Sequence, residues 1–129
     1  MWTFWEYLDR HGRRTFSEWR LGLQKVERAT LDEKMRMVEA FGPGASSLKG
    51  PIKGFRHLYK IRVMTPNRAL RPILCKGPQD KDREYTLLKG AFEVGGNWEP
   101  YGAPADADAK RVEVVTDYRR RIKYEVPKP

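Results

Sequence analysis

A short stretch of the chain carries almost all of its excess positive charge. Between residues 49 and 76 there are eight lysines and arginines and no aspartate or glutamate, in a protein with a net charge of +9. These cations are interleaved with strand-forming residues, which concentrates positive potential on one surface and favours binding to phosphate groups. A plainer interpretation is a solvated face that only keeps the protein soluble. The eight cations are Lys49, Lys53, Arg56, Lys60, Arg62, Arg68, Arg71 and Lys76.

Other common motifs of catalysis and binding are missing from the sequence. The chain has one cysteine, Cys75, and two histidines, His11 and His57, which are too few ligands for the usual zinc site. Gly95-Gly96 is not followed by the lysine and hydroxyl residue of a phosphate-binding loop. We therefore expect neither a metal ion nor a cofactor.

Length and composition indicate a single domain over residues 1–129. A content of 40% hydrophobic and 12% aromatic residues is enough for one modest core. No run reaches the roughly 18 apolar residues that cross a bilayer, and the start at Met1–Trp5 lacks the basic leader of a signal peptide. The lone cysteine fits a reducing compartment. The sequence thus predicts a cytoplasmic protein without a membrane partner.

The hydrophobic pattern predicts a strand followed by two helices. Alternating aromatic residues indicate a first strand over Trp2–Leu8. Thr15–Glu18 and Thr30–Glu33 both have the form of a helix capping box, and apolar residues follow each of them at helical spacing. Gly42–Gly44 ends the second helix. We expect a helical hairpin whose helices start at these two capping signals.

The pattern then changes to the period of two that is typical of strands. Alternation over residues 57–64 puts Lys60 and Arg62 on one face of a strand and His57 on the opposite face. Residues 70–76 are predicted to form the antiparallel return strand, in which Pro72 requires an edge position or a bulge.

A third strand and a last helix complete the predicted fold. Glu84–Phe92 is expected to join the two preceding strands in an antiparallel meander. Pro104 lies near the start of the last predicted helix, Asp106 and Asp108 lie in its first turn, and Arg119-Arg120-Arg121 lie in its last turn. Negative charge at the start and positive charge at the end suit the helix dipole. The predicted class is α+β, with an N-terminal strand, a two-helix hairpin, a meander and a C-terminal helix.

This order of elements, with the motifs that it contains, resembles the RelE/HigB superfamily of toxins from bacterial type II toxin–antitoxin systems, with the phage-associated HigB-like branch closest. The resemblance spans residues 15–121. It is carried by Trp19, Gly50-Pro51-Ile52-Lys53, Leu58-Tyr59-Lys60-Ile61-Arg62, Arg71-Pro72-Ile73-Leu74 and the segment Tyr85–Phe92.

The resemblance implies an mRNA endonuclease, acting with the ribosome, in which the 2′-hydroxyl attacks its own phosphate without a metal ion. Lys60 and Arg62 would supply the two cations that such strands present to the RNA backbone, and Arg71 would open the next strand. Arginines suit the charge-rich phosphorane, so Arg62 and Arg71 are the predicted stabilisers. Crowding by other cations disfavours the charged form of a lysine, which makes Lys60 the predicted proton-transfer group.

Further residues are predicted to bind RNA without doing chemistry. His57 is interpreted as a packing or stacking residue rather than a catalyst, because the predicted strand points it away from Lys60. Glu93 departs from the basic or polar residues of typical nuclease members and would repel phosphate if it faced the site. The predicted RNA-binding set is Lys53, Arg56, His57, Lys76 and Trp98.

Two other functions stay open for the same fold. One is a ParE-like toxin that inhibits DNA gyrase by binding it, and the other is a basic RNA-binding protein without catalysis. The resemblance implies a cognate antitoxin as partner, which would cover the basic surface with acidic or apolar residues. For the nuclease, mRNA and the ribosome are the further expected partners.

Overall fold

The computed structural model describes the whole chain, residues 1–129, as an α+β fold. The helices are α1 (Thr15–Leu21), α2 (Lys25–Phe41) and α3 (Ala103–Thr116), with short 3-10 turns at Gly42–Gly44 and Tyr118–Arg120. The strands are β1 (Thr3–Tyr7), β2 (Leu48–Lys49), β3 (Tyr59–Ile61), β4 (Val63–Met64), β5 (Ala69–Leu70), β6 (Ile73–Lys76), β7 (Glu84–Lys89), β8 (Phe92–Val94), β9 (Asn97–Glu99) and β10 (Arg121–Tyr124).

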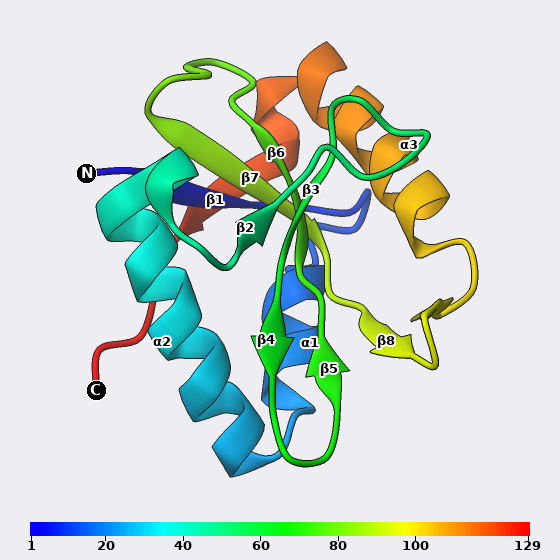
Figure 1. Cartoon of the computed structure of the whole chain (residues 1–129). Coiled ribbons are helices and arrows are strands. Elements are labelled where there is room, and N and C mark those ends of the chain that lie inside the picture. Colours follow the sequence, from blue (N-terminus) through cyan, green and yellow to red (C-terminus); the bar gives the residue numbers. More distant parts are fainter.

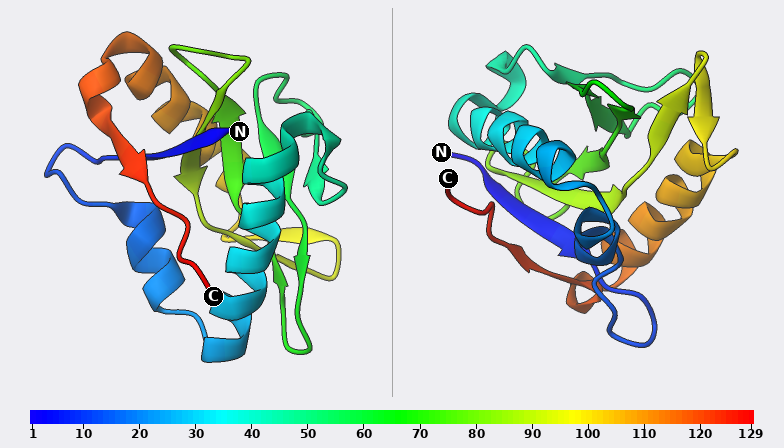
Figure 2. Two further views of the ribbon diagram at one scale, coloured as in Figure 1. Left: turned by 90° about the vertical axis from the view of Figure 1, so that its left-hand side faces the viewer. Right: turned by 90° about the horizontal axis from the view of Figure 1, so that it is seen from below.

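The strands form two sheets, and the helices lie on both faces of the larger one. The six-stranded sheet has the order β10-β1-β7-β6-β3-β2, and the four-stranded sheet has the order β4-β5-β8-β9. Helices α1 and α2 cover one face of the larger sheet and α3 covers the other (Figures 1 and 2). The predicted meander is confirmed in that β3, β6 and β7 are antiparallel neighbours. The parallel pairing of β1 with β7 and the strand β10 were not predicted.

Three neighbouring strands bend together and pass from one sheet into the other. The bends lie at Arg62, at Arg71-Pro72 and at Gly90-Ala91, and backbone hydrogen bonds join them: Ile61 N to Pro72 O at 3.0 Å and Arg71 N to Ala91 O at 2.8 Å. Because proline has no N–H, a regular ladder cannot continue through position 72, as the sequence predicted. The register between β6 and β7 shifts just after it.

Gly90 allows the last of these bends to pack under α1. A Cβ atom at this position would lie 1.9 Å from Cδ2 of Trp19, so only glycine leaves room for the indole. Trp19 in turn contacts the rings of Phe16 and Phe92, with centroids 5.4 and 5.5 Å away. The bend and the first helix therefore fix each other's position.

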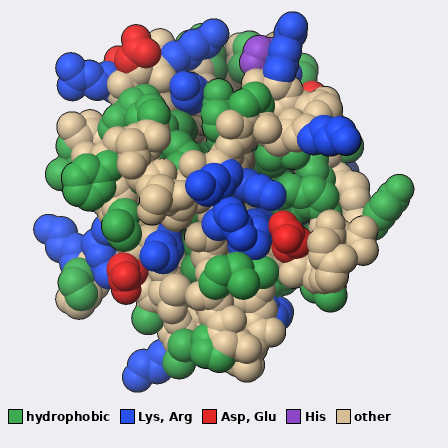
Figure 3. All heavy atoms as spheres, in the orientation of Figure 1, with side chains coloured by type: hydrophobic (Ala, Val, Ile, Leu, Met, Phe, Trp, Pro, Cys, Tyr) green, Lys and Arg blue, Asp and Glu red, His purple; other side chains and the backbone are tan.

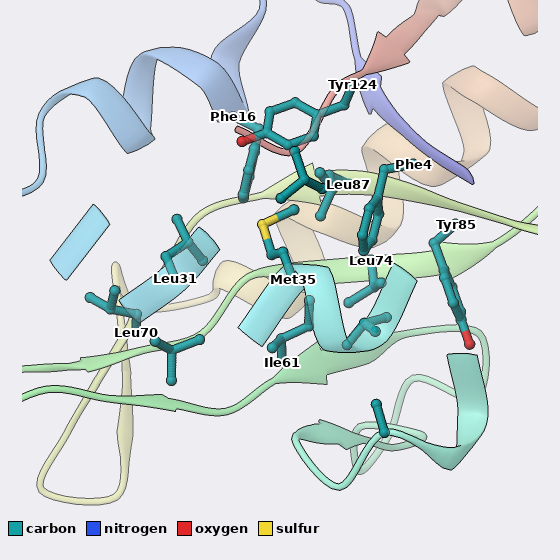
Figure 4. Packing of buried hydrophobic residues seen from close by; sticks show 14 of the residues in the cluster. Phe4, Phe16, Leu31, Met35, Ile61, Leu70, Leu74, Tyr85, Leu87 and Tyr124 are labelled. Atoms are coloured by element: carbon teal, nitrogen blue, oxygen red, sulfur yellow. The ribbon is translucent and has the colours of Figure 1, made fainter. Parts of the chain in front are cut away.

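The larger sheet separates two hydrophobic cores. Side chains from both helices of the hairpin, including Phe16 and Met35, pack on Leu74 and Leu87 of the sheet in the larger core (Figure 4). The smaller core lies under α3, where Ala107 packs against the opposite face of the sheet. Because both faces are covered, β6 and β7 are buried along most of their length.

Both predicted capping boxes are wrong. Helix α1 does start at Thr15, but its first turn is held by Glu6 of β1, whose Oε1 accepts from the backbone N–H of Ser17 at 3.1 Å. A buried carboxylate from another element therefore takes the capping role. Helix α2 starts at Lys25 and not at Thr30, because Gln24 and Glu27 form the capping box that is present.

The prediction that Arg119-Arg120-Arg121 ends the last helix is also wrong. Helix α3 ends at Thr116, and the chain turns back to pair β10 with β1. Arg121 is buried there and its Nη1 lies 3.0 Å from Oε1 of Glu84. The residues after α3 form backbone hydrogen bonds with the edge of β1. These hydrogen bonds favour a strand over a longer helix.

The β4–β5 hairpin is tied to the start of α2 by a buried carboxylate. Arg68 donates from Nε and Nη2 to the two carboxylate oxygens of Glu27 at 2.8 and 2.7 Å. Glu27 is fully buried and also accepts from the backbone N–H of Gln24 at 2.8 Å. The hydrogen bonds from Arg68 are the main cause that lowers the pKa of the Glu27 carboxyl group.

Replacing Glu27 with Gln is expected to lower the free energy of unfolding by about 1–2 kcal/mol at neutral pH, since Arg68 is partly exposed and water screens the pair. The carboxyl pKa is lower in the folded than in the unfolded chain, where it is about 4.3. The stabilisation is therefore full above that value and is lost as the pH falls through the folded pKa. Urea unfolding of both proteins at about pH 7 and about pH 3 measures this difference.

The matched control is Glu33→Gln, an exposed carboxylate of the same helix without an ion pair, which should leave stability unchanged at both pH values. A Glu27→Gln variant as stable as the wild type at neutral pH would contradict the role given to this pair.

Candidate nucleic-acid interface

Most of the cations between residues 49 and 76 have no acidic partner. Figure 3 shows lysine and arginine side chains gathered over β2, β3 and the start of β4, with an acidic side chain beside them. Three of the eight cations pair with carboxylates, namely Lys60, Arg68 and Arg71. The other five form no ion pair: Lys49, Lys53, Arg56, Arg62 and Lys76.

The bend of the strands brings two of the three predicted catalytic residues, Lys60 and Arg71, to Glu93. Nζ of Lys60 lies 3.7 Å from Oε1 of Glu93 and 5.4 Å from the ring centre of Trp98. Arg62 follows in the chain at the bend itself and is exposed. We call this group the strand cluster: Lys60, Arg62, Arg71, Glu93 and Trp98.

Arg71 has the contacts of a structural residue. Its side chain is 2% exposed, Nε donates to Oε1 of Glu93 at 3.2 Å and Nη1 donates to the carbonyl oxygen of Leu70 at 2.9 Å. Nη2 lies 3.6 Å from Sδ of Met64. In this conformation the guanidinium joins β5 to β8 and its donors do not face solvent. Its catalytic role stays a prediction, and Glu93 neutralises part of the charge that a phosphate would meet here.

A hollow lies between the turn before β3 and helix α3, and we call it the loop hollow. It has a volume of about 620 Å³ and is lined by residues 51–57 together with Asp108 and Arg111 of α3. Three residues of the predicted RNA-binding set, Lys53, Arg56 and His57, lie here. Arg111 was not predicted, because no local signal shows that α3 packs beside this turn.

A second hollow, which we call the sheet hollow, adjoins the first and shares Arg56, His57 and Arg111 with it. Its volume is about 330 Å³, and its lining adds Lys76 and Lys81 to the shared residues. It therefore has four cationic side chains and no carboxylate. The volumes of both hollows fall within the range of about 300–1,000 Å³ typical of ligand clefts. Aromatic rings also line the sheet hollow, those of Tyr59 and Tyr118.

The guanidinium groups at these hollows keep donors free for a ligand. Nε of Arg111 donates to Oδ1 of Asp108 at 2.8 Å, and Nε of Arg56 donates to Nε2 of His57 at 3.2 Å. The Nη groups of both arginines have no protein acceptor. Guanidinium forks of this kind bind phosphate oxygens in pairs.

His57 does not lie in a strand, so the face predicted for it is wrong. It occupies the turn before β3, is exposed, and lines both hollows. Partial desolvation, then the charges of Arg111 and Arg56, lower the pKa of its imidazole from the ordinary 6.5. Because an arginine N–H can only donate, Nε2 must accept from Arg56 through its lone pair, and the ring proton of the neutral form sits on Nδ1.

The remaining reactive groups are less suited to chemistry. Cys75 lines the sheet hollow but is 2% exposed, and burial raises the pKa of its thiol to about 12. The thiol therefore stays protonated and is a poor nucleophile. No group of three or more histidine, cysteine, aspartate or glutamate side chains is gathered as metal ligands would be.

Replacing Arg71 with Ala is expected to lower the free energy of unfolding by about 1–3 kcal/mol, since Glu93 and the Leu70 carbonyl lose their donor. Arg62→Ala should change it by no more than about 0.5 kcal/mol, because that side chain is exposed and unpaired. Chemical denaturation of the two variants beside the wild type measures this. Equal stability of all three proteins would show that Arg71 has no structural role and is free to serve a substrate.

Comparison with known proteins gives no relative: no family model matches the chain, and no curated protein or solved structure matches it significantly. None of the helices has the length and apolar character of a membrane span. The resemblance to RelE/HigB toxins therefore rests on the motifs of this chain, and function has to be argued from the basic surface.

Proposed function

We propose that the protein is the toxin of a type II toxin–antitoxin pair and cleaves mRNA by attack of the RNA's own 2′-hydroxyl group. One observation carries the proposal most strongly. The cations of the segment 49–76 that have no acidic partner lie over β2 and β3 and around two hollows beside α3, where an exposed histidine lies among arginines. Such a surface suits a flexible, polyanionic chain such as single-stranded RNA.

A RelE-like topology is part of this proposal. It is supported by the order in the chain of β1, the α1–α2 hairpin and the antiparallel strands β3, β6 and β7. The segments that carry the resemblance fall on these elements, including Trp19 in α1 and Lys60 in β3.

The available side chains fit the tasks of RNA cleavage without a metal ion. The reaction needs donors for the phosphorane, a group that takes the 2′-hydroxyl proton and a surface that holds the backbone. Arg62 and Arg56 have free donors for the phosphate, and one such donor contributes on the order of 2.7–4 kcal/mol in comparable oxyanion sites. Lys53 and Lys76 extend the positive surface along the RNA. Lys60 stays a candidate for proton transfer, although its Nζ lies 3.7 Å from a carboxylate oxygen of Glu93.

The proposed partner is an antitoxin with an apolar helix and acidic residues. The outer face of α2 exposes three large apolar side chains, Val26, Met37 and Phe41, of which Phe41 is 63% exposed. Positions 26, 37 and 41 recur near whole helical turns and so form one stripe. An apolar helix can cover this stripe, and acidic residues beside it can neutralise the basic face.

The same stripe supports a second candidate, a ParE-like toxin that binds DNA gyrase. That function needs an exposed apolar surface on a helix and has no need of a histidine among cations. A third candidate binds RNA without cleaving it. The hollows favour the nuclease, because their lining combines phosphate donors with the imidazole of His57, a side chain that can accept a proton.

Induced expression with mapping of RNA 5′ ends tests the proposal. The wild-type protein is expected to arrest growth and to create new mRNA ends inside translated frames. A variant with Lys53, Arg56 and Arg62 replaced by glutamine should do neither, because these exposed cations contact the RNA. Ends confined to translated frames would also show that cleavage occurs on the ribosome.

A variant that removes the same charge elsewhere is the control: glutamine at the exposed positions Arg10, Lys25 and Lys128, which should arrest growth like the wild type. Arrest without RNA cleavage would replace the nuclease by the gyrase-binding toxin. RNA binding without either effect would leave only the binding protein.

A further inference from the structure

His57 lies at the boundary of the two hollows, where the positive charge is least neutralised. Both hollows include Arg56, His57 and Arg111 in their linings, and the sheet hollow has no carboxylate at all. In the strand cluster, by contrast, Glu93 pairs with both Lys60 and Arg71. Asp108 pairs with Arg111 here, but Arg56, Lys76 and Lys81 form no ion pair. A phosphate therefore meets more uncompensated charge beside His57 than beside Glu93.

We propose that the scissile phosphate of the RNA binds between Arg56 and Arg111 and that His57 takes the proton from the attacking 2′-hydroxyl. The inference rests on the proposed function and places its catalytic centre at the hollows. The strand cluster then binds the RNA backbone and holds the bend of the sheet.

Four separate segments contribute a cation to this place. Arg56 comes from the turn before β3, Arg111 from α3, Lys76 from the end of β6 and Lys81 from the loop after it. Cations that converge from several elements are fixed relative to one another by the fold. The two arginines can hold the phosphate oxygens, and the lysines can hold the neighbouring phosphate.

The protonation state of His57 suits a proton acceptor. Nε2 carries the lone pair and receives an N–H from Arg56 in the free protein. When the guanidinium of Arg56 turns to the phosphate, Nε2 is released and can accept the proton of the 2′-hydroxyl. The contact thus holds the neutral imidazole ready until the substrate arrives.

The reaction is a transesterification. The O2′–H bond breaks and its proton goes to Nε2 of His57, while O2′ forms a bond to phosphorus. The P–O5′ bond breaks and O5′ takes a proton from water. The hydroxide left behind then removes the proton from the imidazolium, so charge and protons balance. The products are a 2′,3′-cyclic phosphate and a 5′-hydroxyl end.

The groups around His57 set the pH range of this step. Partial desolvation and the cations Arg111, Arg56 and Lys81 lower its pKa, and Asp108 opposes them. Cys75, Tyr59 and Lys76 from the sheet and Tyr118 beyond α3 line the same hollow. Because the imidazole must be neutral to accept a proton, the rate should rise with pH through the pKa of His57 and level off above that pKa.

Tyr118 gives this site a surface for a base. Tyr118 lines the sheet hollow and is 45% exposed, so part of its side chain is open to solvent. Nucleotides in single strands are often held by stacking on such rings. A base next to the scissile phosphate can stack there while the phosphate lies on the arginines.

Cleavage kinetics of the purified protein test the inference, with a mixed-sequence oligoribonucleotide and with ribosome-bound mRNA as substrates. His57→Ala should lower the cleavage rate at least about 10²-fold and remove the acidic limb of the pH profile. Imidazole added to the buffer should restore part of the activity of this variant, which a merely structural role would not allow. His57 is exposed and makes one side-chain hydrogen bond, so the variant should fold.

The matched control is His11→Ala. His11 is the other histidine, is equally exposed, and accepts from Nε of Arg10 at 3.3 Å as His57 does from Arg56, but it lines neither hollow. This variant should keep the wild-type rate and pH profile.

The outcomes separate this inference from the proposed function. If the wild type cleaves RNA and His57→Ala keeps its rate and its acidic limb, the inference is overturned and cleavage occurs elsewhere. Loss of activity in Lys60→Met with full activity in His57→Ala would place the chemistry in the strand cluster. If the wild type cleaves neither substrate, the proposed function itself fails.

Discussion

The bend shared by three neighbouring strands is the constraint on which the rest of the structure depends. It occurs where Arg62, Pro72 and Gly90 interrupt the strands, and backbone hydrogen bonds join the three interruptions. The bend divides one set of strands into two sheets and leaves room beneath α1 for the indole of Trp19. In the segment 60–71 that crosses the bend, the charged side chains of Lys60, Arg62 and Arg68 are at least partly exposed, whereas that of Arg71 is buried.

The charge of this face has two different purposes. Some of the cations hold the fold: Arg68 binds the buried Glu27, and the buried Arg71 binds Glu93 across the second sheet. Removing one partner of such a pair takes hydrogen bonds away from a buried group, so these residues contribute to stability. Cations without a partner, such as Arg56 and Arg62, contribute little to folding. The binding of an anionic ligand would explain why these positions carry positive charge.

Local patterns predicted the elements better than the contacts between them. Alternation in residues 57–64 and the proline at position 72 were enough to predict antiparallel neighbours and a break in the second strand. The start of α2 was missed because Thr30–Glu33 has the same pattern as a true capping box, whereas Gln24 and Glu27 form the real one. The parallel pairing of β1 with β7 joins distant segments and leaves no local signal.

In the candidate site, too, residues close in sequence were predicted and contacts between distant segments were not. Lys53, Arg56 and His57 are close in sequence and were predicted together, and the structure does bring them to one hollow. Arg111 belongs to a helix far along the chain, and only the packing of α3 reveals that it completes the hollow. The pairing of Glu93 with Arg71 is likewise a tertiary contact, and no local pattern shows that Arg71 is buried.

The salt dependence of RNA affinity tests the central claim, that the unpaired cations hold RNA phosphates, most directly. If five phosphates are neutralised, the logarithm of the association constant for a single-stranded RNA should fall with the logarithm of salt concentration with a slope of about −3.5. A flat dependence would contradict the account and would assign the basic face to a protein partner.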